Sequence, residues 1–332
     1  MGIRVNLLHG NYKSKSRRVE KGLLGRPDLS LKGQVGIYRI KSTLGRGGEA
    51  VVFLAEDARR LVRKREVALR IPARLDNGTN NLDAIEKVYQ TAKFLFWLNR
   101  LGLEEVVKYY GCCRFAPNSA YIAMERLEGK TLAELRQCRG GRLPLPEALF
   151  IMEKACTALY AVQQAGEKIG RRAVIADFKP ENVFITWQAS RSGKAKVRVV
   201  LPDWDIGARV FAGDYPGDRI VGTPFYIAPE VWRREKPGPW SDRWAIGMVL
   251  YEMVVGQHPF ADAMPDFDGT QTDPSYLYRI SHLANCKAVP EIPGVHAELN
   301  RLIKGLTETN IGMRLDYEET INLIRWLRRK II

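Results

Sequence analysis

The sequence has 332 residues, of which 45% are hydrophobic, and carries a formal net charge of +15 at pH 7. This apolar share is normal for a globular protein, so the composition excludes disorder as the overall state and leaves room for one large domain or two lobes. No uninterrupted apolar run reaches the roughly 18 residues of a membrane-spanning helix, so no transmembrane segment is predicted.

The basic charge gathers at the N-terminus. Residues 1–36 hold eight Lys or Arg against two acidic residues, with Gly and Ser interspersed and no steady period. This pattern predicts a flexible basic arm. An acidic partner, an anionic surface or nucleic acid could bind such an arm, although no specific nucleic-acid motif is present, and a solubilising tail is an equal alternative.

The cysteines are odd in number and irregularly spaced, at positions 112, 113, 138, 156 and 286. They fit neither a disulfide framework nor paired zinc ligands. The N-terminus lacks the long apolar core of a secretory signal. We therefore expect reduced thiols in a cytoplasmic protein.

Residues 37–128 predict a small, mostly β lobe. Apolar and polar residues alternate on both sides of a glycine cluster in "IYRIKSTLGRGGEAVVFLAED" (37–57). Three further strands are predicted at 65–71, 106–115 and 120–129, and one helix at 82–101, where apolar residues recur with helical spacing.

Residues 129–332 predict a larger, helical lobe. Apolar residues lie three and four apart over 131–138, 145–166, 241–255, 298–306 and 317–330. Between these helices, residues 173–230 form short strands and loops that hold the unusual polar residues. The fold class predicted is α+β with two lobes.

The glycine cluster is the first feature with possible chemistry. Gly45, Gly47 and Gly48 in a turn would let backbone N–H groups approach phosphate oxygens without side-chain collision. Tight hairpins also use glycine for conformational reasons, so the cluster alone does not identify a phosphate-binding loop.

Further motifs follow in order: "VALR" (67–70), "AMERLEG" (123–129), "ADFKPEN" (176–182), "DIG" (205–207) and "GTPFYIAPE" (222–230). Together they resemble the eukaryotic-type (Hanks-type) serine/threonine protein kinases over roughly residues 37–330. The resemblance implies a bilobal kinase fold with an N-lobe over 37–128 and a C-lobe over 129–332. It also implies that Arg314 pairs with Glu230.

The resemblance implies an ATP site in the N-lobe. Gly45 and Gly47 match the first two glycines of the family's loop, and Arg70 stands where the phosphate-binding lysine is usual. Met124 matches the gatekeeper. The nucleotide-binding residues implied are Leu44, Gly45, Gly47, Val52, Ala68, Arg70, Met124, Glu125 and Leu127.

The catalytic chemistry can be assigned residue by residue. Phosphoryl transfer needs an aligned acceptor hydroxyl, neutralised phosphate charge and bound magnesium. Asp177 can accept the hydroxyl proton, and Lys179 can stabilise charge on the γ-phosphate. Asn182 and Asp205 offer the oxygen ligands that Mg²⁺ prefers. Asp203 is a rival carboxylate, but the glycine after Ile206 favours Asp205.

Two positions leave the activity open. Arginine at 70 keeps the charge of the usual lysine but is longer, planar and forked. Its helix partner is Glu86 or Gln90, which lie one turn apart on one face, and we favour Glu86.

The residue before Asp177 is Ala176, where the family commonly has an arginine that receives a phosphate from the activation segment. Thr223 is the single Ser or Thr within residues 208–230. We expect it to contact residues 176–182, which resemble the family's catalytic loop. The sequence thus predicts an ATP- and Mg²⁺-dependent kinase for protein Ser or Thr that needs no loop phosphorylation. A nucleotide-binding pseudokinase scaffold is the alternative.

Overall fold

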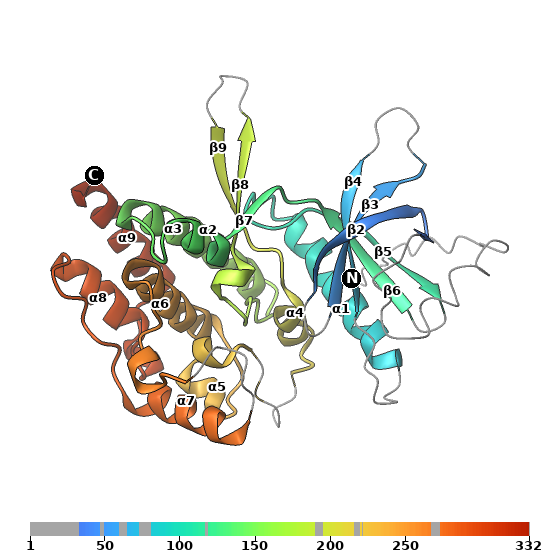
Figure 1. The fold of residues 1–332 in the computed structure, drawn as a ribbon. Coiled ribbons are helices and arrows are strands. Elements are labelled where there is room, and N and C mark those ends of the chain that lie inside the picture. The colour runs from blue at the N-terminus through green and yellow to red at the C-terminus, as the bar shows by residue number, and fades with distance from the viewer. Residues whose placement is uncertain are drawn as a thin grey trace. The chain divides into compact units, whose positions relative to one another are not determined.

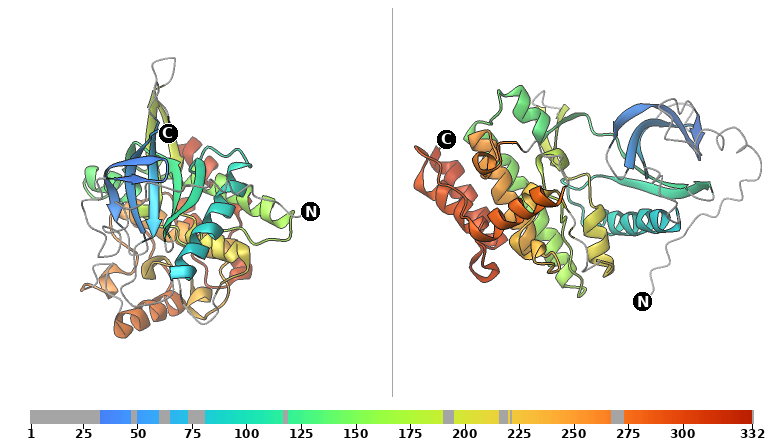
Figure 2. Two further views of the ribbon diagram at one scale, coloured as in Figure 1. Left: turned by 90° about the vertical axis from the view of Figure 1, so that its right-hand side faces the viewer. Right: turned by 60° about the horizontal axis from the view of Figure 1, so that its bottom comes forward.

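The computed structural model describes residues 33–46, 50–59, 65–72, 81–116, 119–189, 195–215, 220, 222–266 and 273–331. They fall into two compact units, which are described separately. The first contains the described residues up to Val88 together with Tyr110–Arg126, and the second contains Tyr89–Tyr109 and Leu127 onward. Figures 1 and 2 show that strands dominate the first unit and helices the second.

The first unit is built on a six-stranded sheet. In spatial order its strands are β1 (Gln34–Val35), β2 (Tyr38–Arg46), β3 (Ala50–Asp57), β4 (Glu66–Pro72), β6 (Ser119–Glu125) and β5 (Tyr109–Ala116). Because side chains alternate along a strand, one face of this sheet buries an apolar core that includes Val51, Phe53, Val67, Leu69 and Tyr121. The sheet starts at Gln34, ahead of the boundary predicted at residue 37, and residues 1–32 of the predicted arm lie outside the described residues.

The second unit contains the C-terminal half of α1 (Asn81–Asn99), from Tyr89 onward, and a three-stranded sheet. The strands are β7 (Gly129–Thr131), β8 (Phe184–Ala189) and β9 (Ala195–Val200). The remaining helices are α2 (Leu132–Cys138), α3 (Leu145–Glu167), α4 (Asp205–Ala212), α5 (Pro229–Trp232), α6 (Pro239–Val255), α7 (Pro274–Cys286), α8 (Ala297–Leu306) and α9 (Tyr317–Ile331).

Helix α6 is the centre of this unit. It is buried from Pro239 to Met253 except at Trp240, as expected for a helix that is apolar on all sides. Helices α3 and α8 pack against it, and α9 packs along α3 (Figure 1). This central helix supplies Asp242, whose carboxylate accepts from the backbone N–H groups of Ile175 and Ala176.

The structure confirms the five helices predicted for this unit, with ends shifted by two residues or fewer. It adds α4, α7 and the short α5, which the sequence pattern did not reveal. All five cysteines are free. Within the described ranges, no helix combines the length and apolar character that crossing a membrane requires.

Candidate active site

Five of the residues implied to bind nucleotide lie on one face of the first unit's sheet. Val52 of β3 lies opposite Gly45 of β2 on one side and opposite Arg70 of β4 on the other. Ala68, two residues before Arg70, lies opposite Met124 of β6. Residues directly opposite each other in antiparallel strands share a face, so these side chains line the face turned away from the core.

The other nucleotide-binding candidates are less closely placed. Leu44 is 48% exposed near the end of β2, and Glu125 ends β6. Leu127 belongs to the second unit. Gly47 lies outside the described residues.

The predicted helix partner of Arg70 lies at the surface. Glu86 is exposed on α1. The Arg70–Glu86 ion pair favoured from the sequence stays a prediction. The alternative residue, Gln90, donates from Nε2 to Asp214 Oδ2 at 3.1 Å within the second unit.

Asp177 is the centre of a polar network on the catalytic loop. Its Oδ1 accepts from both the backbone N–H and the hydroxyl of Thr223, at 3.1 and 3.0 Å. Its Oδ2 lies 2.9 Å from Lys179 Nζ and accepts from Asn182 Nδ2 at 3.0 Å. Lys179 Nζ also donates to Thr223 Oγ1 at 2.6 Å. The structure thus brings three predicted site residues, Lys179, Asn182 and Thr223, to the carboxylate of a fourth, Asp177.

The backbone before Asp177 is held in a strained conformation. Ala176 has φ of +61°, in the left-handed region that costs a residue with a Cβ about 1–2 kcal/mol. Asp242 of α6 compensates, because its Oδ1 accepts from Ala176 N at 2.8 Å and its Oδ2 from Ile175 N at 3.0 Å. Burial raises the pKa of Asp242 to about 7, against the lowering effect of these two N–H groups.

The two residues predicted to hold magnesium, Asn182 and Asp205, each have hydrogen-bond partners in the second unit. Asn182 Nδ2 donates to both the backbone carbonyl and Oδ2 of Asp177, at 3.0 Å each. Asp205 is the first residue of α4, and its Oδ1 accepts from Thr91 Oγ1 at 2.9 Å. Asp203 lies just before it, with Oδ1 3.4 Å from Asp205 N.

Comparison with known proteins identifies the family. A family model described as a protein kinase domain matches residues 38–324. The chain belongs to the protein kinase family.

Serine/threonine-protein kinases are among the kinase's relatives. It is 31% identical over 277 residues to PknA of Corynebacterium glutamicum, covering 80% of this chain and 50% of that protein. It is 30% identical over 228 residues to PrkC of Bacillus subtilis, covering 68% and 31%, and 26% identical over 284 residues to ULK1 of Homo sapiens, covering 84% and 24%. The kinase therefore spans half or less of the length of these relatives.

The segment of the kinase that follows Thr223 is fixed by a buried histidine that the sequence analysis missed. His258 stacks on Phe225 with ring centroids 4.0 Å apart and an interplanar angle of 19°. Its Nδ1 accepts from Phe260 N at 3.2 Å, which leaves Nε2–H to donate to Phe225 O at 3.1 Å. This neutral tautomer ties the segment to the loop that follows α6.

Burial lowers the pKa of His258 to about 3, from 6.5. Below pH ~6.5 the unfolded chain binds a proton that the folded chain does not, so this residue's contribution to stability is lost as the pH falls. We expect His258→Gln to gain stability relative to the parent protein by about 1.4 kcal/mol per pH unit between roughly pH 6 and 4. Asp242 titrates in the opposite sense, so only the difference between the two proteins, measured by urea unfolding, is diagnostic. A difference that does not change with pH would contradict the assignment.

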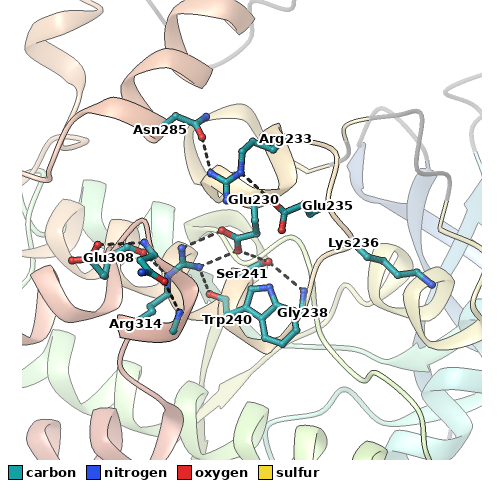
Figure 3. A network of polar contacts seen from close by, with 12 residues as sticks. Glu230, Arg233, Glu235, Lys236, Gly238, Trp240, Ser241, Asn285, Glu308 and Arg314 are labelled. Carbon is teal, nitrogen blue, oxygen red and sulfur yellow. Dashed lines mark hydrogen bonds and ion pairs between the residues drawn. The ribbon is translucent and has the colours of Figure 1, made fainter.

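A buried ion pair joins α5 to the segment between α8 and α9, as the sequence predicted. Arg314 donates to both carboxylate oxygens of Glu230, at 3.0 and 3.1 Å, and both side chains are fully buried (Figure 3). Ser241 Oγ donates to Glu230 at 2.7 Å, and Arg314 also donates to the carbonyls of Trp240 and Glu308. This network fixes α5, directly after the Thr223 segment, against the rest of the unit.

Proposed function

We propose that this chain transfers the γ-phosphate of ATP to serine or threonine side chains of proteins. The observation that carries the proposal is the arrangement around Asp177, where one carboxylate faces a lysine ammonium, a threonine hydroxyl and an asparagine amide. Phosphoryl transfer needs little covalent chemistry from the protein and much positioning of charge. Family membership and the names of the relatives support the same reaction.

Asp177 would accept the proton of the acceptor hydroxyl. Oδ1 already holds the hydroxyl of Thr223 at 3.0 Å, so the carboxylate is oriented to receive hydroxyl hydrogens. Lys179 would place its ammonium beside the transferring phosphoryl group, because it lies 2.9 Å from the same carboxylate. Thr223 bridges the two and would fix the segment along which the acceptor lies.

For the cofactors, we propose ATP on the sheet face that bears Val52, Ala68 and Arg70, with Arg70 toward the phosphates. Magnesium supplies charge neutralisation to the phosphate oxygens when it is bound. Asn182 and Asp205 would hold the magnesium ion. Asp203, whose Oδ1 lies 3.4 Å from Asp205 N, is the alternative carboxylate.

We propose that the activity needs no phosphate on the activation segment. The side chain of Ala176 is a methyl group, which cannot bind a phosphate. The backbone N–H at this position donates to the Asp242 carboxylate. The Thr223 segment is already tied to Asp177, Lys179 and His258. Treatment with a phosphatase should therefore leave the initial rate unchanged, and loss of activity on such treatment would contradict this part of the proposal.

A nucleotide-binding pseudokinase is the second candidate, and arginine at position 70, where the family usually has the phosphate-binding lysine, favours it. The two functions differ in phosphate incorporation. With labelled ATP and magnesium, an enzyme labels itself or a basic protein substrate on serine or threonine, whereas a scaffold binds ATP without incorporation.

Arg70→Lys probes this departure from the family. We expect the rate to stay equal or to rise by up to roughly 10- to 150-fold, because a fork that misses one charged hydrogen bond loses about 1.5–3 kcal/mol. Initial rates with a peptide substrate measure the effect, and Arg70→Met, which removes the charge, should lower the rate. A fall with lysine would show that the arginine is adapted to this site.

The partners of the kinase follow from the same proposal. Its substrates would be proteins with an accessible serine or threonine, and the basic arm over residues 1–36 would bind an acidic partner or an anionic surface. The cytoplasmic location stays a prediction from the sequence.

A further inference from the structure

Helix α4 lies directly after the carboxylates proposed to hold magnesium. It runs from Asp205 to Ala212, and Gly213, whose φ is +82°, forms its left-handed C-cap. Gly207 brings the helix against the backbone that precedes the catalytic loop, because a Cβ at this position would collide with the carbonyl oxygen of Val174. The placement of α4 therefore decides where the Asp205 carboxylate lies.

Residues of α1 contact α4 at its first residue and at Phe211, and they also contact Asp214 just past its end. The contacting residues are Gln90, Thr91, Phe94 and Trp97, which follow one another at helical spacing within the second unit. Thr91 donates to Asp205 at the first residue of α4, and Gln90 donates to Asp214, two residues past its end. Both ends of the α4 segment are thus fixed by hydrogen bonds from neighbouring positions of α1.

An aromatic cluster fixes the middle of the contact. The ring of Phe211 on α4 lies 4.7 Å from Phe94 and 4.8 Å from Trp97. Phe94 also meets Trp204, just before α4, edge to face at 5.9 Å. Arg171 donates to the Phe211 carbonyl at 3.0 Å and covers the same ring. Aromatic pairs of this geometry add to the stabilisation gained from buried area alone.

Thr91 is placed to orient one carboxylate. Its residue is 4% exposed, so the hydroxyl has little access to water, and Asp205 Oδ1 at 2.9 Å is its acceptor. Ligating carboxylates are commonly held by a hydrogen bond from a residue behind them, and loss of such a partner weakens metal binding by about 10- to 100-fold.

We propose that Thr91 is a positioning residue for Asp205, and that Gln90, Thr91, Phe94 and Trp97 fasten the segment 205–214 in place without a phosphate. The first clause rests on the proposed function, because it takes Asp205 as a magnesium ligand. The second does not depend on activity.

Magnesium binding tests the role of Thr91. Thr91→Val keeps the shape of the side chain and removes the hydroxyl, whereas Thr91→Ser keeps the hydroxyl. In a magnesium titration of the full-length protein with saturating ADP, followed by thermal shift, we expect Val to weaken the apparent affinity for magnesium about 10- to 100-fold and Ser to stay near the parent value. Unchanged or tighter magnesium binding in Thr91→Val would overturn the positioning role.

Hydrogen exchange tests the fastening independently. Phe211→Ala removes the aromatic contact, and we expect the α4 amides to exchange at least about tenfold faster, because local opening frees them from protection. Phe96→Ala is the matched control, since Phe96 is 42% exposed on the same α1 helix. Equal exchange in the two variants would overturn the fastening. If the parent protein binds no nucleotide with magnesium, the proposed function fails, while this exchange experiment still decides the second clause.

Discussion

Replacing Asp177 with asparagine is expected to lower the rate of phosphate transfer by about 10²- to 10⁴-fold, the usual contribution of a positioned general base. Asparagine keeps the size of the side chain, but it cannot take the hydroxyl proton, and its amide nitrogen cannot accept from Thr223 or Lys179. Initial rates under saturating ATP measure the change. The thermal shift produced by ATP should persist, because Asp177 is not among the residues proposed to bind nucleotide.

An exposed aspartate provides the control for this substitution. Asp262→Asn changes the same chemical group at an exposed position in a short 3₁₀ turn and should leave the rate within about twofold. Comparable loss in both variants would mean that the assay reports folding or aggregation rather than catalysis. A rate unchanged in Asp177→Asn would remove this carboxylate from the reaction.

Truncating Arg314 to alanine is expected to destabilise the protein by about 3–5 kcal/mol, because it leaves the Glu230 carboxylate buried without its bidentate partner. The unfolding midpoint in urea measures the loss. Replacing both residues with leucine should cost less than either single truncation, since no uncompensated charge is then buried.

The control for this prediction is an ion pair at the surface. Arg301 lies 3.1 Å from Glu298, but its side chain is 70% exposed. Arg301→Ala should therefore change the stability by less than about 1 kcal/mol. Equal losses at Arg301 and Arg314 would contradict the view that burial, and not the ion pair itself, sets the energy at Glu230.

The sequence predicted those parts of the site that depend on local pattern. Gly45, Val52 and Arg70 lie on one sheet face because strand alternation and the order of the strands place them there. Asp177, Lys179 and Asn182 meet because they lie within six residues of one loop. Spacing along the chain contains this information.

Contacts between distant segments could not be predicted in the same way. Asp242 supports Ala176 from 66 residues away, and His258 supports Phe225 from 33 residues away. Spacing alone could not choose between Glu86 and Gln90, because both lie on one face of the helix. Gln90 and Thr91 bond to residues in and after α4, a helix that the pattern of residues 205–212 did not reveal.

Some signals for these residues were present. His258 precedes Pro259 and Phe260 shortly after a buried helix. Thr91 lies next to Gln90 on α1 and is itself buried. Both are polar residues within apolar surroundings. Buried polar groups require partners, so each pointed to a tertiary hydrogen bond. The partner itself needed the fold.

The central claim is that this chain transfers phosphate and does not only bind nucleotide. The most direct measurement is incorporation of labelled phosphate from ATP into serine or threonine of a basic protein substrate, with and without magnesium, for the parent protein and Asp177→Asn. We predict magnesium-dependent incorporation by the parent protein and a loss of at least about 100-fold in the variant. Incorporation by the parent protein no greater than that by Asp177→Asn, while ATP still raises the melting temperature of both, would contradict the claim.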